Sequence, residues 1–226
     1  MIHEARSRAK KMKNPFVFTL ALAVVSSQAF AADPETILGK KGKVLLEENF
    51  AGNGLPSGWT KNTGTIVASD GVLRITELAS DKHAGAFRKA LPMKDLAIQL
   101  DFKFEQAKMF HIGFDPAPGE LKKKGHLYSV VINPEKISIL EHNDKANPDS
   151  KPKTLGAKSS DLKNGQWYKM LLENKGDEVL VHIDGVEMVR AKSDDFRVKK
   201  PGIVLRVMGA DKDGVCIDNM TVWELN

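Results

Sequence analysis

The sequence has few of the residues that build disulfide scaffolds. It contains one cysteine among 226 residues, which excludes an internal disulfide framework and any metal site with several thiolate ligands. Long apolar runs are also scarce, since the apolar stretch at residues 16–25 is far shorter than the roughly 20 residues that a membrane-spanning helix needs. After the first 31 residues, no segment shows a convincing helical period over three turns. The chain is therefore expected to build its core from strands.

The excess of positive over negative charge is also small. The formal net charge is +5, but five of the 34 basic residues and one of the 29 acidic residues lie within the first 31 positions. The remaining chain therefore carries a net charge of +1. The basic isoelectric point of the whole sequence therefore gives no argument for nucleic-acid binding, which needs a basic patch on the folded domain. With 42% hydrophobic and 28% charged residues, the chain is typical of a packed globular protein.

The N-terminal segment has the three parts of a secretory signal peptide. Lysines at positions 10, 11 and 13 precede the apolar stretch, and the tripeptide at 29–31 matches an A-x-A cleavage site. We therefore expect a signal peptide over residues 1–31, with Met12 as an alternative initiator. The mature chain would be secreted or periplasmic, with a linker at 32–42, one domain at 43–226 and no membrane span after cleavage.

The mature chain consists of short apolar runs that alternate with polar residues and end at turn residues. The segment 97–105 is the clearest case, because its apolar side chains fall on every second position, as in a strand with one buried face. About a dozen such segments predict an antiparallel β-sandwich or barrel. They lie at 44–50, 65–68, 72–76, 85–91, 97–105, 109–114, 127–132, 137–141, 167–173, 179–183, 186–189, 203–208 and 215–223.

Three local features refine this prediction. Asp184-Gly185 between two apolar runs indicates a type I′ hairpin, in which both central residues need a positive φ. The alternation of the last strand changes phase at Asp218-Asn219, and a β-bulge there would keep its apolar residues on one face. The polar stretch 143–164 reads as a surface loop between strands.

Several of these elements together resemble secreted jelly rolls of the concanavalin A-like and laminin-G-like type. The resemblance rests on Phe50, Leu55-Pro56-Ser57-Gly58-Trp59, Asp70-Gly71-Val72-Leu73, Gly125-His126-Leu127-Tyr128, Trp167, Gly176, Asp184-Gly185, the segment 202–207 and Ile217-Asp218-Asn219. Within this group, the chain is most similar to the 3-keto-disaccharide hydrolase-like domains. The resemblance implies two packed antiparallel sheets, one of them concave, with sugars bound at the concave face or at the loops around it.

Two departures from the related families prevent a transfer of catalytic residues. An Asn-Ser-Gly-type segment is expected after the strand at 96–105, but residues 109–114 read Met-Phe-His-Ile-Gly-Phe instead. Sandwich glucanases of this architecture carry a Glu-x-Asp-x-x-Glu string, and here no Glu lies two residues before an Asp. Asp101 and Glu105 share a strand face, but at roughly 13 Å they are too far apart to act as a glycosidase pair. Catalytic residues therefore remain unassigned.

The outward face of the strand at 97–105 supplies a candidate binding site. If the three residues that follow it form a hairpin turn, matching the core faces places Phe104 opposite Phe110. The same register puts Lys103 opposite His111, and Asp101 opposite a glycine, on the other face. Such a face could hydrogen-bond the hydroxyl groups of a sugar. The alternative is the ordinary solvated face of an amphipathic strand.

Other candidates for binding carry weaker patterns. Trp59 lies in a Pro-Ser-Gly-Trp loop and could stack on a sugar ring, whereas Trp167 and Trp223 are expected to close the core. Arg206 lies among apolar neighbours and needs an acidic partner or a ligand oxygen. Cys216, in the last strand, is expected to be an unreactive small hydrophobe.

No cofactor or metal is expected from the sequence. The histidines have no metal-ligand spacing, and no Gly-rich phosphate loop or G-x-S-x-G motif is present. Asp211, Asp213 and Gly214 leave a calcium site open as an alternative, although this pattern before a strand is typical of a hairpin turn.

The sequence thus favours a secreted, lectin-like β-sandwich that binds a polysaccharide or cell-surface glycan without turnover. Its expected contacts are Asp101, Lys103, His111, Arg206 and Trp59. One alternative is a glycoside hydrolase or lyase of the 3-keto-disaccharide hydrolase-like type, which would need paired carboxyl groups or an acid with a shifted pKa in one cleft. The other is an adhesion module that contacts protein through an exposed apolar patch.

Overall fold

The structure, a computed structural model, describes residues 35–210 and 212–226. The expected signal peptide lies outside this part of the chain. The described residues form two antiparallel sheets, with two short 3-10 helices, η1 (Ala79–Asp81) and η2 (Asp194–Arg197), in the connections. The all-β sandwich predicted from the alternating pattern is confirmed. None of the helices found among these residues has the length and apolar character needed to cross a membrane.

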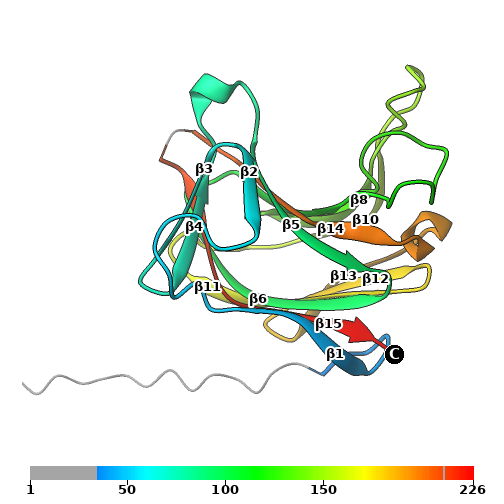
Figure 1. Cartoon of the computed structure of the whole chain (residues 1–226), viewed down its shortest axis with the longest axis horizontal. Helices are drawn as coiled ribbons and strands as arrows, with labels where there is room; N and C mark the ends of the chain where they lie inside the picture. The colour runs from blue at the N-terminus through cyan, green and yellow to red at the C-terminus, as the bar shows by residue number, and fades with distance from the viewer. Residues whose placement is uncertain (1–34, 211) are drawn as a thin grey trace, which may run out of the picture. The chain divides into compact units, whose positions relative to one another are not determined.

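One sheet has eight strands and the other has seven (Figure 1). The eight-stranded sheet has the order β13 (Val186–Lys192), β12 (Glu178–Ile183), β11 (Trp167–Lys175), β6 (Leu96–Glu105), β15 (Gly214–Leu225), β4 (Val72–Thr76) and β3 (Thr65–Ser69), and β1 (Lys41–Glu48) also pairs with β15. The seven-stranded sheet has the order β10 (Lys153–Ser159), β9 (Lys136–Glu141), β8 (Tyr128–Asn133), β7 (Met109–Phe114), β14 (Lys200–Met208), β5 (Gly85–Met93) and β2 (Trp59–Thr63).

The core lies between the two sheets and is built from the inward residues of nearly every strand. Phe102 and Phe104 of β6 face Phe110 of β7 across it, with the rings of Phe102 and Phe110 6.1 Å apart. Tyr128 of β8 and Asn174 of β11 also meet in the core, where the tyrosine hydroxyl donates a 3.0 Å hydrogen bond to the amide oxygen. This bond ties one sheet to the other and gives two buried polar groups a partner.

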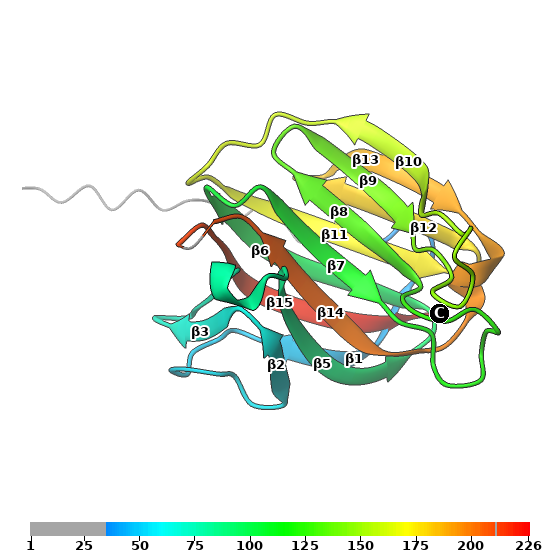
Figure 2. The same cartoon turned by 90° about the horizontal axis from the view of Figure 1, so that it is seen from above.

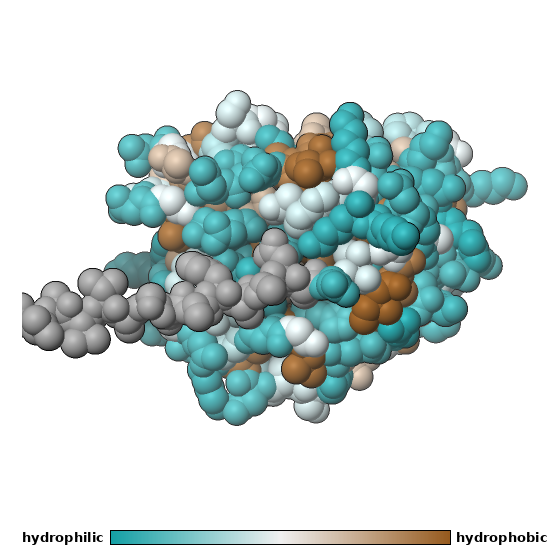
Figure 3. Space-filling model, turned by 90° about the horizontal axis from the view of Figure 1, so that it is seen from below, coloured by the Kyte–Doolittle hydropathy of each residue, from teal (hydrophilic) through white to brown (hydrophobic). Residues whose placement is uncertain are grey.

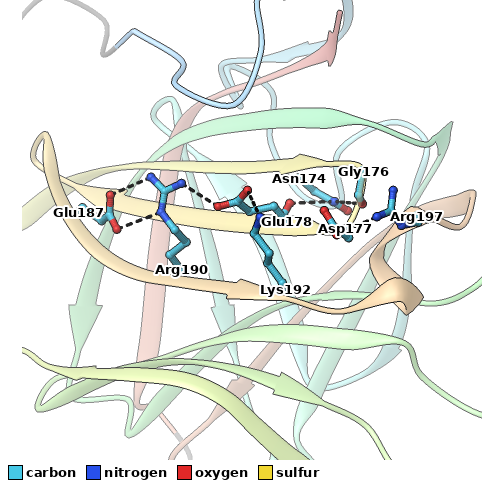
Figure 4. Close-up of polar contacts among 8 residues, drawn as sticks. All are labelled: Asn174, Gly176, Asp177, Glu178, Glu187, Arg190, Lys192 and Arg197. Atoms are coloured by element: carbon cyan, nitrogen blue, oxygen red, sulfur yellow. Dashed lines mark hydrogen bonds and ion pairs between the residues drawn. The ribbon is translucent and has the colours of Figure 1, made fainter.

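Polar contacts also hold the β11–β12 turn and the hairpin that follows it (Figure 4). The side-chain amide of Asn174 donates to the carbonyl oxygens of Gly176 and Glu178. Farther along the hairpin, Arg190 reaches the carboxylates of Glu178 at 2.7 Å and Glu187 at 3.1 Å. Because these ion pairs are exposed to solvent, they contribute little to stability, and the buried amide is the stronger constraint.

The β12–β13 hairpin and the bulge in β15 are confirmed. Asp184 and Gly185 have φ values of 49° and 78°, as a type I′ turn requires. The pairing of β15 with β6 shifts between Asp218 and Thr221, and Asn219 has a φ of 49°. As a result, the apolar residues on both sides of the bulge point into the core.

The prediction of a loop over 143–164 is wrong for its second half. Residues 153–159 form β10, an edge strand that pairs with β9. Its sequence, KTLGAKS, has no clear apolar alternation, because most of its side chains are exposed. The expected linker at 32–42 also joins the domain in part: β1 begins at Lys41, and the backbone amides of Ile37 and Leu38 donate to the buried Glu173 carboxylate at 2.9 and 2.8 Å.

The predicted β6–β7 hairpin is wrong. β6 pairs with β11 and β15 in the eight-stranded sheet, whereas β7 pairs with β14 and β8 in the other sheet. The connection crosses between the sheets through Gln106, whose φ is 69°. A crossing and a hairpin both bury the phenylalanines of the two strands, so alternation alone cannot distinguish them.

The two outward faces of the sandwich differ. Figure 3 shows the molecule from the side of the eight-stranded sheet, where the surface outside the grey segment is mostly hydrophilic, with small separate apolar patches. On the opposite side, the outward face of the seven-stranded sheet lies between the η1 segment and the loops that follow β7 and β9 (Figure 1). This second face, which we call the loop-flanked face, carries the polar cluster described next.

Candidate functional site

The strand register brings Arg206 and His111 together on the loop-flanked face. In β14, Ile203, Leu205 and Val207 point into the core, so Arg206 points outward. The same alternation turns His111 of β7 outward, and the register places it directly opposite Arg206. Cross-strand neighbours on the same face have side chains in contact range, so these two residues form the centre of a site.

A glycine next to this pair leaves room for the guanidinium of Arg206. Gly113 lies two residues beyond His111 in β7 and has Val204 and Ser129 as cross-strand partners. A Cβ atom at this position would lie 2.5 Å from Nη1 of Arg206 and 2.9 Å from Oγ of Ser129. The guanidinium of Arg206 therefore extends along the sheet over a position that only glycine leaves open.

A carboxylate and a histidine from the loop after β7 complete one side of the site. Asp115 follows the last residue of β7, and its Oδ1 accepts a 2.6 Å hydrogen bond from Nδ1 of His126. Its other oxygen contacts the guanidinium of Arg88, from β5. The backbone bond from Leu127 N to Phe114 O closes this loop and sets His126 beside the sheet.

These contacts fix the tautomer of His126 and the charge of Asp115. Because a carboxylate only accepts, Nδ1 of His126 carries a hydrogen, and Nη2 of Arg206 lies 3.1 Å from Nδ1 and 3.2 Å from Nε2. Burial raises the pKa of Asp115, but the hydrogen bonds from His126 and Arg88 outweigh burial and hold that pKa at about 2. Asp115 is therefore an anion at any ordinary pH.

Two further imidazoles line the site in their neutral form. His142, one residue after β9, hydrogen-bonds Oγ of Ser129 at 2.8 Å, and its ring centre lies 5.3 Å from that of His126. Burial is the main cause that lowers the pKa of His142 to about 4, and the positive charge of Arg206 acts in the same direction. Burial and the charge of Arg206 also lower the pKa of His111 to about 4. Both imidazoles are uncharged at pH 7 and can accept hydrogen bonds or protons.

Two buried polar atoms of this cluster have no hydrogen-bond partner. They are Nδ1 of His111 and Nη1 of Arg206, and they come from residues directly opposite each other. Arg206 as a whole is only 9% exposed. A buried donor without a partner is costly, so such atoms are expected where a ligand or water supplies the missing bond. A cavity of about 240 Å³ lies on the Asp115 side of the cluster, lined in part by Arg88, Asp115 and Val204.

The sequence-predicted site residues do not form one surface. Asp101 and Lys103 point outward from the eight-stranded sheet, on the opposite side of the sandwich from His111 and Arg206. Asp101 accepts a 2.9 Å hydrogen bond from the side chain of Asn219, and Nζ of Lys103 lies 5.1 Å from the ring centre of Trp167. Of the predicted site residues, the structure thus brings together only His111 and Arg206.

The expectations for the tryptophans need correction, and of the two kinds of partner expected for Arg206 the acidic side chain does not contact it. Trp59 is 3% exposed within the core, so it presents no ring surface to a sugar. Trp167, expected in the core, is 38% exposed on the eight-stranded sheet. Arg206 faces the imidazole of His126 instead of an acidic side chain, and Asp115 acts on it through its charge alone. Cys216 is 4% exposed, and burial raises its pKa to about 12, consistent with an unreactive thiol.

Sequence reasoning missed Asp115, His126 and His142. Two of them had a signal in the strand pattern: β8 and β9 form a hairpin in which Tyr128 lies opposite Glu141. His126 and His142 flank these paired positions, so the hairpin predicts that they lie at the same end of the sheet. Asp115 had no comparable signal, because loop closure alone decides where it lies.

Metal binding has no support from the arrangement of ligands. Within residues 35–210 and 212–226, no three His, Cys, Asp or Glu side chains are grouped as a metal ion would require. Of the suggested calcium ligands, Asp211 lies outside the described residues, and Oδ2 of Asp213 accepts a hydrogen bond from the backbone amide of Ala210.

Comparisons with solved structures show that other β-sandwich proteins share this fold. The sequence matches none of the curated proteins with which it was compared. Among solved structures, SCLam, a non-specific endo-beta-1,3(4)-glucanase from family GH16, has a TM-score of 0.63 at 14% identity, over 85% of this chain and 94% of that one. The carbohydrate-binding module CBM66 from Bacillus subtilis has a TM-score of 0.58 at 12% identity, over 74% of this chain and 96% of that one.

A third similar structure is LamAcat from Zobellia galactanivorans, with a TM-score of 0.56 at 12% identity over 80% of this chain and 97% of that one. At such identities the likeness shows the fold alone. The family model of the 3-keto-alpha-glucoside-1,2-lyase-like domain, in contrast, matches residues 46–222, from β1 to β15. The chain is therefore a member of the 3-keto-alpha-glucoside-1,2-lyase-like domain family.

Proposed function

We propose that this protein cleaves glycosides whose sugar carries a ketone at C3, by elimination across C1 and C2, at the loop-flanked face. The observation that carries the proposal is the unpartnered Nη1 of Arg206 beside three imidazoles, of which His111 and His142 are neutral. Ionisable groups with strongly shifted pKa values cluster at catalytic sites more often than at passive surfaces. Family membership supports the class of reaction.

The chemistry of a 3-keto sugar explains what such a site would do. The ketone acidifies the hydrogen on C2, so a base removes it and the electron pair moves to the ketone oxygen as an enolate. The enolate then collapses, a C1–C2 double bond forms, and the C1–O bond breaks. The departing oxygen takes up a proton, giving an alcohol and an unsaturated ketone. No water is consumed, which distinguishes this lyase step from hydrolysis.

The residues of the site match the two requirements of this reaction. Nη1 of Arg206 would donate to the ketone oxygen, where negative charge develops in the transition state. His126 is the candidate base, since Asp115 orients its ring through Nδ1 and leaves Nε2 without a carboxylate partner. Nη2 of the same guanidinium contacts the ring of His126, so a ketone oxygen on Nη1 would lie close to that ring. His111 and His142 would accept hydrogen bonds from sugar hydroxyl groups.

The alternative of glycan binding without turnover has less support from the geometry. Trp59, the aromatic residue expected to stack on a sugar, lies in the core. An aspartate that orients a histidine next to a buried arginine is an arrangement of acid–base chemistry more than of simple hydroxyl recognition. Binding of the sugar without turnover is therefore the alternative result of the test.

The test is incubation of the purified protein with methyl 3-keto-α-glucoside in D₂O. We expect an ultraviolet absorbance from the unsaturated ketone, release of methanol, and deuterium at C2 of recovered substrate. Methyl α-glucoside, which has no acidic C2 hydrogen, should not react. Release of glucose from the unoxidised glucoside would overturn the lyase proposal in favour of a hydrolase. Binding of the ketone without deuterium exchange or product would replace it with a binding module.

Variants assign the reaction to the site. Arg206→Met and His126→Gln should each lower kcat/KM by about 100-fold or more, as expected when an oxyanion donor or a general base is removed. Asp101→Ala, on the outward face of the other sheet, is the matched control and should retain full activity. Equal losses in the control and the site variants would show that the site lies elsewhere.

A further inference from the structure

A second cavity lies at the far end of the loop-flanked face. Its volume is about 700 Å³, within the range of pockets that hold small organic ligands. Polar side chains line it, among them Gln106, Lys108, Asn133, Glu135, Lys136 and Asn164. The lining includes amides and charges of both signs, which suits an uncharged ligand rich in hydroxyl groups.

The strand register connects this cavity to the candidate active site. Asn133 of β8 pairs with Lys136 of β9, and Lys136 pairs with Ser159 of β10. Asn133 shares the face of Ser129, which lies four residues earlier in β8, so the two positions are roughly 13 Å apart along the strand. Figure 2 shows the β8–β9 turn, the β6–β7 connection and the segment after β10 at one end of β8, and the loops after β7 and β9 at the other.

Two features of the cavity point to a missing ligand. Oδ1 of Asn133 is buried and has no hydrogen-bond partner, so it needs a donor. A hydroxyl group can supply that donor, whereas a carboxylate or phosphate ion offers only acceptors. Gln106, which also lines the cavity, has a φ of 69°, in the left-handed region that non-glycine residues rarely adopt. Strained residues of this kind are concentrated at ligand sites.

We propose that this cavity is a distal subsite for the leaving group of an oligosaccharide substrate. The inference rests on the proposed function, because it places the 3-keto unit at Arg206. The linked sugars then lie over Val131 and Ser138 toward Asn133, which a single leaving sugar would not reach. Val131 and Ser138 are opposite each other in the register between the two ends, and they are 8% and 7% exposed. The preferred substrate is thus a neutral α-glucan oligosaccharide oxidised at C3 of its terminal unit.

The experiment compares two substrates on one enzyme. Maltotetraose oxidised at C3 of the non-reducing unit should have a kcat/KM above that of methyl 3-keto-α-glucoside. Asn133→Ala should lower kcat/KM for the oligosaccharide by about tenfold, through KM, as expected for one lost hydrogen bond. The same variant should leave the methyl glycoside unaffected. Asn62→Ala, an exposed asparagine on β2 of the same sheet, is the matched control.

Each outcome separates this inference from the proposed function. Turnover of the methyl glycoside with no gain from chain length and no effect of Asn133→Ala would overturn the subsite and leave the lyase intact. If neither substrate reacts, titration with unoxidised maltotetraose decides: binding weakened by Asn133→Ala supports the subsite, and no binding overturns it. If Asn133→Ala does not fold, Gln106→Gly serves instead, because glycine tolerates the φ at that position and removes the lining side chain.

Discussion

Gly113 leaves the space that the guanidinium of Arg206 occupies. A Cβ atom on Gly113 would lie 2.5 Å from Nη1 of Arg206, closer than any van der Waals contact allows. Gly113 does not have a positive φ, so the position requires the small size of glycine and not its conformational freedom. The neighbouring strand thus determines where the arginine of the site points.

The first prediction follows from this contact. Gly113→Ala should push the guanidinium away from the ketone oxygen and lower kcat/KM for methyl 3-keto-α-glucoside by about 100-fold, because small displacements of catalytic groups carry costs of this order. Its free energy of unfolding should change by no more than about 1 kcal/mol, since the backbone conformation suits alanine. Steady-state kinetics and urea denaturation measure the two effects.

A glycine outside the site provides the control. Gly52→Ala places its Cβ in open space, with no atom within 4 Å, and should change neither activity nor stability. Full activity of Gly113→Ala would contradict a catalytic position for Arg206.

The second prediction separates the two halves of the face expected from the sequence. His111→Ala should lower kcat/KM by about tenfold or more, because it removes a neutral acceptor beside Arg206. Lys103→Ala should have no effect, since Lys103 lies on the other sheet, against the ring of Trp167. The same assay with both variants measures the difference, and a loss of activity in Lys103→Ala alone would move the site to the eight-stranded sheet.

The fold could be predicted because alternation shows which side of a strand is buried. It correctly identified most strands, the Asp184-Gly185 hairpin and the bulge at Asp218-Asn219. It could not identify β10, whose side chains are mostly exposed on both faces. It also could not decide whether β7 follows β6 in the same sheet, because burial of Phe102 and Phe110 satisfies either arrangement.

The site was harder to predict than the fold. Arg206 and His111 could be found, because each is a polar residue at an outward position of an otherwise apolar strand. Asp115 lies in a loop, where no periodicity predicts position, and His126 could be placed only through the pairing of β8 with β9. Trp59 illustrates the opposite error: its loop-like sequence context suggested exposure, but the start of β2 directs the ring into the core.

The third prediction concerns stability in acid. His111 and His142 have pKa values of about 4 in the folded protein, against about 6.5 in an unfolded chain. Between pH 6.5 and 4 the unfolded state therefore binds more protons than the folded state, so the free energy of unfolding falls as the pH falls. Asp115 adds to this fall only near pH 4 and below, because its carboxyl takes up a proton near pH 3.9 in the unfolded chain but has a pKa of about 2 in the folded protein.

Denaturation curves at several pH values measure this effect. His142→Asn should reduce the difference in bound protons between the unfolded and folded states by about one over the same window. His83→Asn replaces an exposed histidine outside the site and serves as the control. A pH dependence that His142→Asn leaves unchanged would show that the imidazole is not held in its neutral form.

The fourth prediction concerns a buried lysine outside the site. Lys200, at the start of β14, is 1% exposed, and its Nζ donates to the carbonyl oxygens of Lys94, Phe196 and Val198 at 2.9–3.0 Å. Lys200→Met fills the same space but leaves these three acceptors without a donor. Because unpaired buried acceptors are costly, the free energy of unfolding should fall by about 2–4 kcal/mol. Lys199→Met, at the exposed neighbouring position, should have little effect. Urea denaturation of both variants measures the difference, and equal stabilities would show that water replaces the ammonium group at no cost.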